Sequence, residues 1–446
     1  MANLLSLDNF NAGLLKFLQS SPTPFHATRN LQERLVAAGF IALNESDAWE
    51  LEPANRYVIT RNDSSIIAFI YGVSPLLETG IRMMGAHTDS PCLKVKPRAE
   101  LNRRGYFQLG VEVYGGALLA PWYDRDLSMA GRVSCSNLQG EIVSVLVDFE
   151  RAVATIPSLA IHLDREANNA RSINAQKDIV PLVLQLPAED SPVPDFRALL
   201  FSELQRQHPG LPVDKVLDYE ISLYDTQAPA LVGFEQNFIS SARIDNLLSC
   251  YIGLESLLNA SSEVSSLLIC TDHEEVGSAS CCGAKGPMLE QFLERLMPEV
   301  DKRVRVIERS MMISADNAHG IHPNFMEKHD ENHGPLLNRG PVIKVNANQR
   351  YATTSETSAL FRLFCARAEV PVQAFVARTD MGCGSTIGPV VASEVGVKTI
   401  DVGCPTFAMH SIRELAGTKD GWWLYKAGVE FFNYLKAPVA MVTLMK

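Results

Sequence analysis

Residues 268–278 read Leu268-Ile269-Cys270-Thr271-Asp272-His273-Glu274-Glu275-Val276-Gly277-Ser278, an apolar run that ends in four ionisable side chains. The apolar part predicts a buried strand. Ionisable side chains are costly to hold near a core unless a metal or a reaction uses them, although an acidic surface turn would look similar. Ligands of an open α/β sheet bind beyond the carboxyl ends of its strands, where one glutamate could coordinate a metal and its neighbour move protons.

Ligand-type residues recur at other predicted element ends. They are His87 and Asp89 after the apolar run 81–86, Asp316 after 310–315, His410 some residues after 397–402, and Asp245 just before the helical pattern of 247–258. A lone histidine beside a strand is more often a core residue. Histidines and carboxylates at several strand ends together favour a site for divalent zinc, or for cobalt or manganese.

The composition excludes several classes of protein. The 446 residues are 46% hydrophobic, enough for two or three domains with large cores. Forty basic and fifty-one acidic residues give 40 − 51 = −11, which argues against nucleic-acid binding. No apolar run approaches the ~20 residues that cross a bilayer, and the N-terminus lacks signal-peptide features. Nine cysteines without Cys-x-x-Cys spacing predict reduced thiols in the cytoplasm, and the vicinal pair Cys281-Cys282 suggests no role.

The order of patterns along the chain predicts an α/β domain interrupted by a β-rich insertion. An N-terminal helix, a hairpin at 57–70 and the strand before His87 come first. Short β-like runs then alternate with polar turns, and afterwards helical runs alternate with apolar strands to the end. The predicted division is a catalytic domain formed by residues 1–94 and 236–446, with residues 95–235 inserted.

Five segments in this order resemble the aspartyl aminopeptidase family of di-zinc exopeptidases. They are Gly85-Ala86-His87-Thr88-Asp89-Ser90-Pro91, Trp122-Tyr123-Asp124-Arg125-Asp126-Leu127, Asp272 to Gly277, Ser314-Ala315-Asp316 and Met409-His410-Ser411-Ile412-Arg413-Glu414. The likeness extends across nearly the whole chain. It implies a three-layer α/β catalytic domain whose β-rich insertion serves dimerisation and as a lid. It also implies a cytoplasmic hydrolase that removes N-terminal Asp or Glu from peptides with two Zn²⁺ per subunit, or Co²⁺ or Mn²⁺ in their place.

The family pattern places five metal ligands on this chain. It implies that Asp245 bridges two metal ions. His87 and Asp316 would complete one coordination sphere, and Glu275 and His410 the other. This is sound chemistry, because a carboxylate can bridge two cations, neutral imidazoles complete each sphere, and an open position remains for water and substrate.

The resemblance also implies three residues that act in catalysis. Glu274 would be the general base that takes a proton from the water bridging the metal ions, and Asp89 would orient the imidazole of His87. His162 lies in an apolar run, where the default interpretation is a core histidine. The family implies instead that it enters the neighbouring subunit's active site and polarises the scissile carbonyl. Family members often carry a second histidine four residues earlier, where this chain has Ser158.

Two residues are candidates for substrate binding. Lys344 lies in an apolar strand, where its ammonium either snorkels to water or neutralises an anion. The resemblance implies a counter-charge for an acidic substrate side chain, with His319 lining the same pocket. It implies a homo-oligomer built from dimers, up to a tetrahedral dodecamer. The acidic composition and the apolar runs predict no nucleic-acid or membrane partner. A di-zinc aminopeptidase of neutral or broad specificity, a related deacylase and a non-catalytic scaffold are the alternatives, and the intact ligand set argues against the last.

Overall fold

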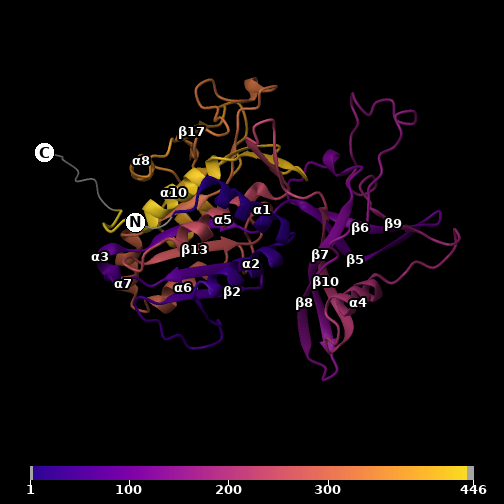
Figure 1. Ribbon diagram of the computed structural model, residues 1–446, viewed down its shortest axis with the longest axis horizontal. Helices are drawn as coiled ribbons and strands as arrows, with labels where there is room; N and C mark the ends of the chain where they lie inside the picture. Colours follow the sequence, from indigo (N-terminus) through magenta and orange to yellow (C-terminus); the bar gives the residue numbers. More distant parts are fainter. Residues whose placement is uncertain (1–3, 439–446) are drawn as a thin grey trace. The chain divides into compact units, whose positions relative to one another are not determined.

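The computed structural model describes residues 4–438 as an α/β chain of two compact units (Figure 1). The first unit contains the chain up to Asp89, Pro229–Met409 and the chain from Glu414, and the second contains Ser90–Ala228 and His410–Arg413. The boundary at Asp89 lies 94 − 89 = 5 residues before the one predicted from the sequence, and the boundary at Ala228 lies 235 − 228 = 7 residues before its predicted position. Within residues 4–438 no helix is long and apolar enough to span a membrane.

A nine-stranded sheet forms the centre of the first unit. Its strands in spatial order are β1 (Ile41–Ala42), β2 (Arg56–Arg61), β3 (Ser65–Ile70), β13 (Ser266–Thr271), β4 (Arg82–His87), β14 (Met311–Ala315), β18 (Lys398–Gly403), β16 (Val342–Val345) and β17 (Gln373–Val376). The predicted hairpin is confirmed as β2–β3. Strands β13, β4, β14 and β18 are parallel neighbours, and all but Lys398 of their residues are buried.

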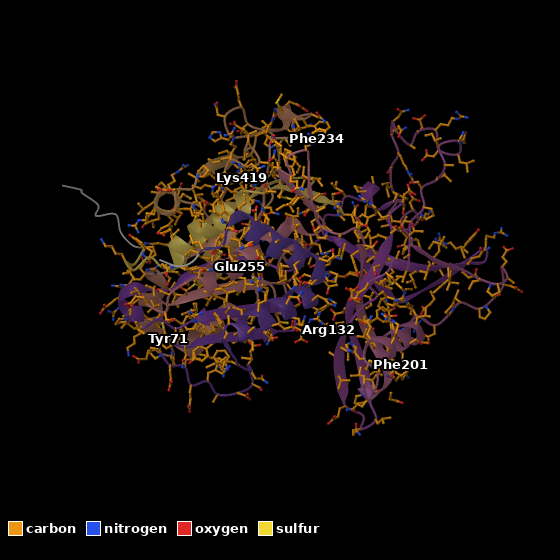
Figure 2. The ribbon with its side chains drawn as sticks, in the orientation of Figure 1. Tyr71, Arg132, Phe201, Phe234, Glu255 and Lys419 are labelled. Atoms are coloured by element: carbon orange, nitrogen blue, oxygen red, sulfur yellow. The ribbon has the colours of Figure 1, made fainter. Side chains whose placement is uncertain are left out.

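Helices cover both faces of this sheet, which makes the first unit three-layered. Successive strand residues alternate between two cores, as Met83 and Met84 of β4 do. One core contains side chains of α1 (Leu7–Ser20), α2 (Pro24–Ala37), α5 (Ile244–Leu258), α8 (Ser355–Arg367) and α10 (Asp420–Phe432). The other contains side chains of α3 (Leu76–Thr79), α6 (Met288–Leu296), α7 (Val300–Glu308) and α9 (Ile387–Val395). Glu255 of α5, labelled in Figure 2, is buried and forms an ion pair with Arg34 of α2.

A smaller five-stranded sheet also belongs to the first unit. Its order is β11 (Ala230–Val232), β12 (Phe238–Ser241), β20 (Glu414–Gly417), β19 (Pro405–Phe407) and β15 (Ala318–His319). Strand β15 begins two residues after Asp316, and β19 ends three residues before His410. The sequence pattern did not reveal β19, because a three-residue strand is too short to show an alternating period.

The second unit is built on an antiparallel six-stranded sheet. Its order is β8 (Ile142–Asp148), β7 (Leu127–Asn137), β10 (Val213–Asp225), β5 (Cys92–Arg103), β6 (Tyr106–Tyr114) and β9 (Leu182–Gln185). Helix α4 (Phe196–Gln207) packs Phe196, Leu200 and Leu204 into its core. Arg132 of β7, labelled in Figure 2, forms an ion pair with Glu220 of β10 at 2.6 Å. The short β-like runs predicted in this region are confirmed as strands of this sheet.

Candidate metal centre

Three adjacent parallel strands bring ligand-type side chains to one edge of the large sheet. Thr271 of β13 pairs with His87 of β4, and β14 flanks β4 on its other side. His87 ends β4, Asp316 follows β14 directly, and Glu274 opens the short 3₁₀ helix η2 (Glu274–Val276) just after β13. Because the carboxyl ends of neighbouring parallel strands meet at the same edge, these residues converge. The predicted strand ends are confirmed.

Asp245 reaches the same place from the start of helix α5. The backbone of Asp245 and Asn246 is non-helical and the peptide bond between them is cis, so both precede the regular helix. The backbone N–H of Asp245 donates to Oε2 of Glu414 at 2.9 Å. The amide of Asn246 donates to the carbonyl of Ala315, the last residue of β14, at 2.9 Å. These two bonds fix the helix start beside Asp316.

The imidazole of His87 is the centre of the cluster. Its Nε2 lies 3.5 Å from Oδ1 of Asp245, 3.7 Å from Oδ1 of Asp316 and 3.9 Å from Oε2 of Glu274. Ligand atoms of His87, Asp245 and Asp316 all lie within 4.8 Å of one another, as do those of His87, Glu274 and Glu275. The structure therefore brings four of the five predicted ligands together with Glu274. His87, Asp245 and Asp316 are buried, and the two glutamates are half-buried.

Asp89 contacts both the imidazole of His87 and the backbone of the two glutamates. Its backbone carbonyl lies 3.0 Å from Nδ1 of His87, and its carboxylate Oδ1 lies 3.4 Å from the same nitrogen. The two carboxylate oxygens accept the backbone N–H groups of Glu274 and Glu275, each at 3.1 Å. Asp89 therefore orients the imidazole and also anchors the segment that carries both glutamates, a role hidden from the sequence because Asp89 and Glu274 are 185 positions apart.

The crowding of carboxylates shifts the protonation of the cluster. Burial alone would lower the pKa of His87, because it opposes a charged imidazole. Hydrogen bonds to Asp245, Asp316 and Asp89 and the negative charge of Glu274 outweigh this effect of burial. The pKa of His87 is therefore raised well above its ordinary value. The pKa of Glu274 is raised to about 7, chiefly by burial. The positive charge of His87 opposes this rise, and the carboxylates of Asp316, Asp245 and Asp89 add to it.

The donor set fits a divalent cation. Imidazole nitrogen and carboxylate oxygen are ligands that zinc accepts, whereas iron–sulfur clusters and copper(I) require thiolates or thioethers. Carboxylates buried together are unfavourable without compensating positive charge. A bound dication would supply that positive charge at the point where the acidic groups converge. It would then take the place of the proton that His87 otherwise carries.

Lys344 lies in β16 with only 2% of its surface exposed, so snorkelling to solvent is the wrong interpretation. Its ammonium donates to Oδ2 of Asp316 at 3.3 Å and to the carbonyl of Asn317 at 3.0 Å. It also lies 5.1 Å from the ring centre of Tyr351. The lysine therefore neutralises a predicted metal ligand from inside the first unit.

A cavity of about 330 Å³ opens beside His319, and two of the side chains that line it, Lys328 and Arg378, are cationic. His322, Lys328, His329 and Arg378 contribute to its wall, and Phe375 and Phe407 provide apolar surface. His319 keeps part of its surface exposed, but burial of its ring and the charge of Lys344 lower its pKa, while Asp245 and Asp316 oppose this shift. The other polar residues of this wall were not predicted from the sequence. For the histidines the signal is a cluster of four of the chain's ten histidines from His319 to His333.

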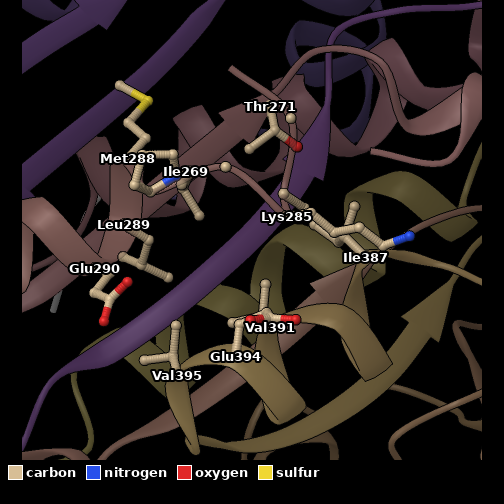
Figure 3. Close-up of a pocket in the computed structure, with 14 residues that line it drawn as sticks. Ile269, Thr271, Lys285, Met288, Leu289, Glu290, Ile387, Val391, Glu394 and Val395 are labelled. Atoms are coloured by element: carbon tan, nitrogen blue, oxygen red, sulfur yellow. The ribbon is translucent and has the colours of Figure 1, made fainter. Parts of the chain in front are cut away.

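A second cavity, of about 120 Å³, lies between the loop after β13 and helix α9 (Figure 3). Ile269, Ile387 and Val391 line it, and Lys285 and Glu394 reach it from opposite walls. Its volume is below the ~300 Å³ at which ordinary ligand pockets begin. None of the predicted ligands lines this cavity.

Two predicted residues belong to the second unit. His162 is exposed within a turn at 161–163, so the interpretation as a core histidine is wrong. His410 groups with the second unit by its contacts, although it directly follows Met409 of the first. Its Nδ1 lies 3.2 Å from the carbonyl of Gly116. The role of His162 in a neighbouring subunit and that of His410 as a ligand stay predictions.

Comparison with known proteins identifies the family. The family described as Aminopeptidase I zinc metalloprotease (M18) matches residues 17–432. A "Probable M18 family aminopeptidase 2" of Stutzerimonas stutzeri (strain A1501) is 59% identical over 431 residues, 97% of this chain and 100% of that protein. The cryo-EM structure of the Ape4 and Nbr1 complex gives a TM-score of 0.91 at 37% identity, covering 96% of this chain and 86% of that one. The structure of the S. cerevesiae mApe1 dodecamer gives 0.78 at 29% identity, covering 95% of each. The chain therefore belongs to the M18 family of zinc metalloproteases, the aminopeptidase I family.

Proposed function

We propose that this zinc aminopeptidase is a cytoplasmic enzyme that removes an acidic residue, Asp or Glu, from the N-terminus of peptides with two Zn²⁺ per subunit. The observation that carries the proposal is the convergence of His87, Asp245, Glu274 and Asp316 at the carboxyl ends of β4, β13 and β14 and the start of α5. Nine cysteines without a disulfide support a reducing compartment.

The five ligands divide between two ions. In the proposed arrangement Asp245 is shared, His87 and Asp316 hold one ion, and Glu275 and His410 hold the other. Zinc bound there would polarise the scissile carbonyl and make water more acidic. Asp89 supports this division, because it fixes His87 on one side and the backbone of Glu275 on the other.

Glu274 moves the proton. It would accept a proton at a carboxylate oxygen during attack on the peptide bond and deliver it to the departing amine. A carboxylate suits this work when its pKa lies near the working pH, because it can then both take up and release a proton. The pKa of Glu274, which burial raises to about 7, supports this role. Its Oε2, 3.9 Å from Nε2 of His87, lies beside the reacting centre.

The preference for an acidic residue is supported by positive charge around the cluster. The cavity beside His319 presents Lys328, Arg378 and histidines to its contents, and Lys344 lies deeper, against Asp316. An acidic substrate side chain would be held there by charge-assisted hydrogen bonds. A leucine of similar size would make no charge-assisted hydrogen bond to Lys328 or Arg378.

Hydrolysis of peptides that differ only in the first residue tests the function. Peptides that begin with Asp, Glu, Leu or Lys are assayed with the native protein, after chelation and after zinc re-addition. We expect chelator-sensitive cleavage restricted to Asp and Glu. Metal-dependent cleavage of the Leu peptide would favour a neutral or broad-specificity aminopeptidase. Cleavage of none by a folded, zinc-loaded sample would contradict the proposal.

Lys344→Ala should lower kcat/KM selectively for acidic peptides. Losing one hydrogen bond to a charged group costs about 1.5–3 kcal/mol, which corresponds to roughly tenfold to a hundredfold. The measurement is the ratio of kcat/KM for Asp- and Leu-leading peptides, together with zinc content. Arg303→Ala, on α7 away from the cavity, is the control. An equal loss on both peptides with zinc depletion would show that Lys344 serves Asp316 instead.

The exposed turn around His162 supports a homo-oligomer. Leu159, Ile161 and Leu163 flank the histidine and are 50%, 49% and 74% exposed. Neighbouring apolar side chains left in water mark a protein–protein contact. We propose that a second copy of the chain covers them and receives His162 in its active site, within an assembly that extends to a dodecamer. The mApe1 relative is named as a dodecamer, which supports this assembly.

Mixed oligomers test the role of His162. Chains carrying His162→Ala and chains carrying Glu274→Gln should each be nearly inactive alone. If His162 acts across subunits, dissociation and joint reassembly will restore part of the activity, because some sites then combine an intact Glu274 with a partner's intact histidine. His208→Ala, an exposed histidine in the same unit, is the control and should leave activity unchanged. An inactive mixture, or full activity of His162→Ala alone, contradicts the trans arrangement.

A further inference from the structure

Two segments without regular secondary structure lie beside the cavity at His319. The cavity loop, residues 377–386, joins β17 to α9 and contributes Ala377, Arg378, Met381 and Gly382 to the wall. The Tyr351 segment, residues 350–353, precedes α8. The ring centre of Tyr351 lies 5.1 Å from the ammonium of Lys344 and 6.5 Å from the ring centre of Phe375, which also lines the cavity.

One buried carboxylate of β18 holds both segments. Asp401 is fully buried, and each of its carboxylate oxygens accepts a hydrogen bond from a different segment. The backbone N–H of Ala352 donates to Oδ2 at 2.6 Å, and the hydroxyl of Thr386 donates to Oδ1 at 2.5 Å. The backbone N–H of Asp401 donates in turn to Oγ1 of Thr353 at 3.0 Å. A single residue of the large sheet therefore anchors the end of the cavity loop and the Tyr351 segment.

Helix α9 approaches this carboxylate so closely that only glycine fits at the point of contact. A Cβ atom added to Gly388, in the first turn of α9, would overlap both carboxylate oxygens of Asp401. Thr386 is also the N-cap of this helix, because its hydroxyl accepts the N–H of Gly388. Burying a carboxylate costs free energy unless donors or cations compensate. Burial raises the pKa of Asp401, and the positive charge of Lys344 and the hydrogen bonds to its oxygens oppose this rise.

The two segments are also joined to each other. Nε of Arg350 donates to the carbonyl of Cys383 at 3.2 Å, and the hydroxyl of Ser385 donates to the carbonyl of Arg350 at 3.3 Å. Asp401 therefore holds the cavity loop twice, directly at its last residue and through the Tyr351 segment. Asp401 does not line the cavity, so it can act on a substrate only through these two segments.

We propose that Asp401 is a positioning residue for substrate recognition, which fixes the cavity loop and the Tyr351 segment so that the cavity is ordered before the peptide binds. This role rests on the proposed function, which places the first side chain of the peptide in that cavity. Ordering an irregular segment costs conformational entropy, and an anchor that orders it in the free enzyme removes this cost from binding. Loss of the anchor should therefore weaken substrate binding and leave the groups at the metal centre in place.

Replacing the threonine that donates to Asp401 tests this role with little change in volume. Thr386→Val removes the hydroxyl, whereas Thr386→Ser keeps it. We expect KM for an Asp-leading peptide to rise about tenfold to a hundredfold in Thr386→Val, because small displacements of positioning groups have effects of this size. The values of kcat and zinc content should stay near native, and Thr386→Ser should keep the native KM. Asp401→Ala, which removes both acceptor oxygens, should raise KM at least as much.

Comparison of KM with kcat separates positioning from a loss of folded protein. Partial unfolding lowers the concentration of active enzyme, so the apparent kcat falls while KM stays unchanged, whereas weaker binding raises KM. An unchanged KM in Thr386→Val, or an equal rise in Thr386→Ser, overturns the proposal. An unchanged KM in a folded Asp401→Ala does so as well. If Asp401→Ala does not fold, the two Thr386 variants decide.

The proposed function and the role of Asp401 can fail separately. The preference of the native protein among Asp-, Glu-, Leu- and Lys-leading peptides tests the function. The KM of each variant is then measured on the peptide that the native protein prefers. A native preference for the Leu-leading peptide would contradict the acidic specificity, and a rise in KM for that peptide in Thr386→Val would still support the anchor.

Discussion

Glu274→Gln is expected to lower kcat for an Asp-leading peptide by about 10²–10⁴-fold while zinc content stays at the native level. The amide has the shape of the carboxylate but cannot take up a proton at the pH where the enzyme works. Glu274 is held by Asp89 through its backbone N–H, so the replacement leaves that anchor intact. Steady-state kinetics and elemental analysis of the same preparation measure the two quantities.

Glu290→Gln is the matched control, since Glu290 is exposed in the first turn of α6 and outside the cluster. It should behave as the native protein. Turnover near the native rate in Glu274→Gln would remove this residue from proton transfer. Loss of zinc from the same variant would make Glu274 a ligand and would leave the proton-transfer role to another group.

Asp245→Asn should release zinc and abolish activity, because the residue proposed as the shared ligand of two ions would lose its charge and one of its two donor oxygens. Asp245 is buried and its Oδ1 lies 3.5 Å from Nε2 of His87. A metal bound only by the folded state stabilises it by about 2.7 kcal/mol at a hundred times Kd. Chelation should therefore lower the unfolding temperature of the native protein and have no effect on that of Asp245→Asn.

Asp420→Asn provides the buried-carboxylate control for this comparison. Asp420 is fully buried, and its oxygens accept the N–H groups of Asn338 and Gly340 at 2.6 and 2.9 Å. Its replacement should lower stability and leave the response to chelator unchanged. Native zinc content in Asp245→Asn would rule out a shared ligand at this position.

Local patterns in the sequence were enough to predict the elements that carry the centre. Apolar runs that end in His87, Asp316 and Glu274 predict strands whose ends meet, and the sheet register confirms them. Each of these signals lies within a dozen consecutive residues. The alternation of burial along β4 and β13 follows from the same runs.

The remaining parts of the centre depend on contacts between segments far apart in the chain. Such contacts leave no helical or strand periodicity in a single sequence, so they could not be predicted from it. Examples are Asp89 accepting the backbone of Glu275, and Glu414 accepting the backbone of Asp245. The ammonium of Lys344 turns inward because Asp316 lies there, and a local pattern allows either direction. The cationic cavity comes from irregular loops around His322 and Arg378, where no periodic signal exists.

The placement of β4 between β13 and β14 has a consequence for synthesis on the ribosome. Strand β13 begins 266 − 87 = 179 residues after β4 ends. At about 5–20 residues per second, β4 waits roughly 10–40 s for its first partner. All six strands of the second unit are made within that interval. The nascent chain thus carries a completed insertion while apolar β4 is unpaired and the edge of β3 that later pairs with β13 is open, although β3 can already pair with β2. This is the period in which chaperones protect the chain or aggregation removes it.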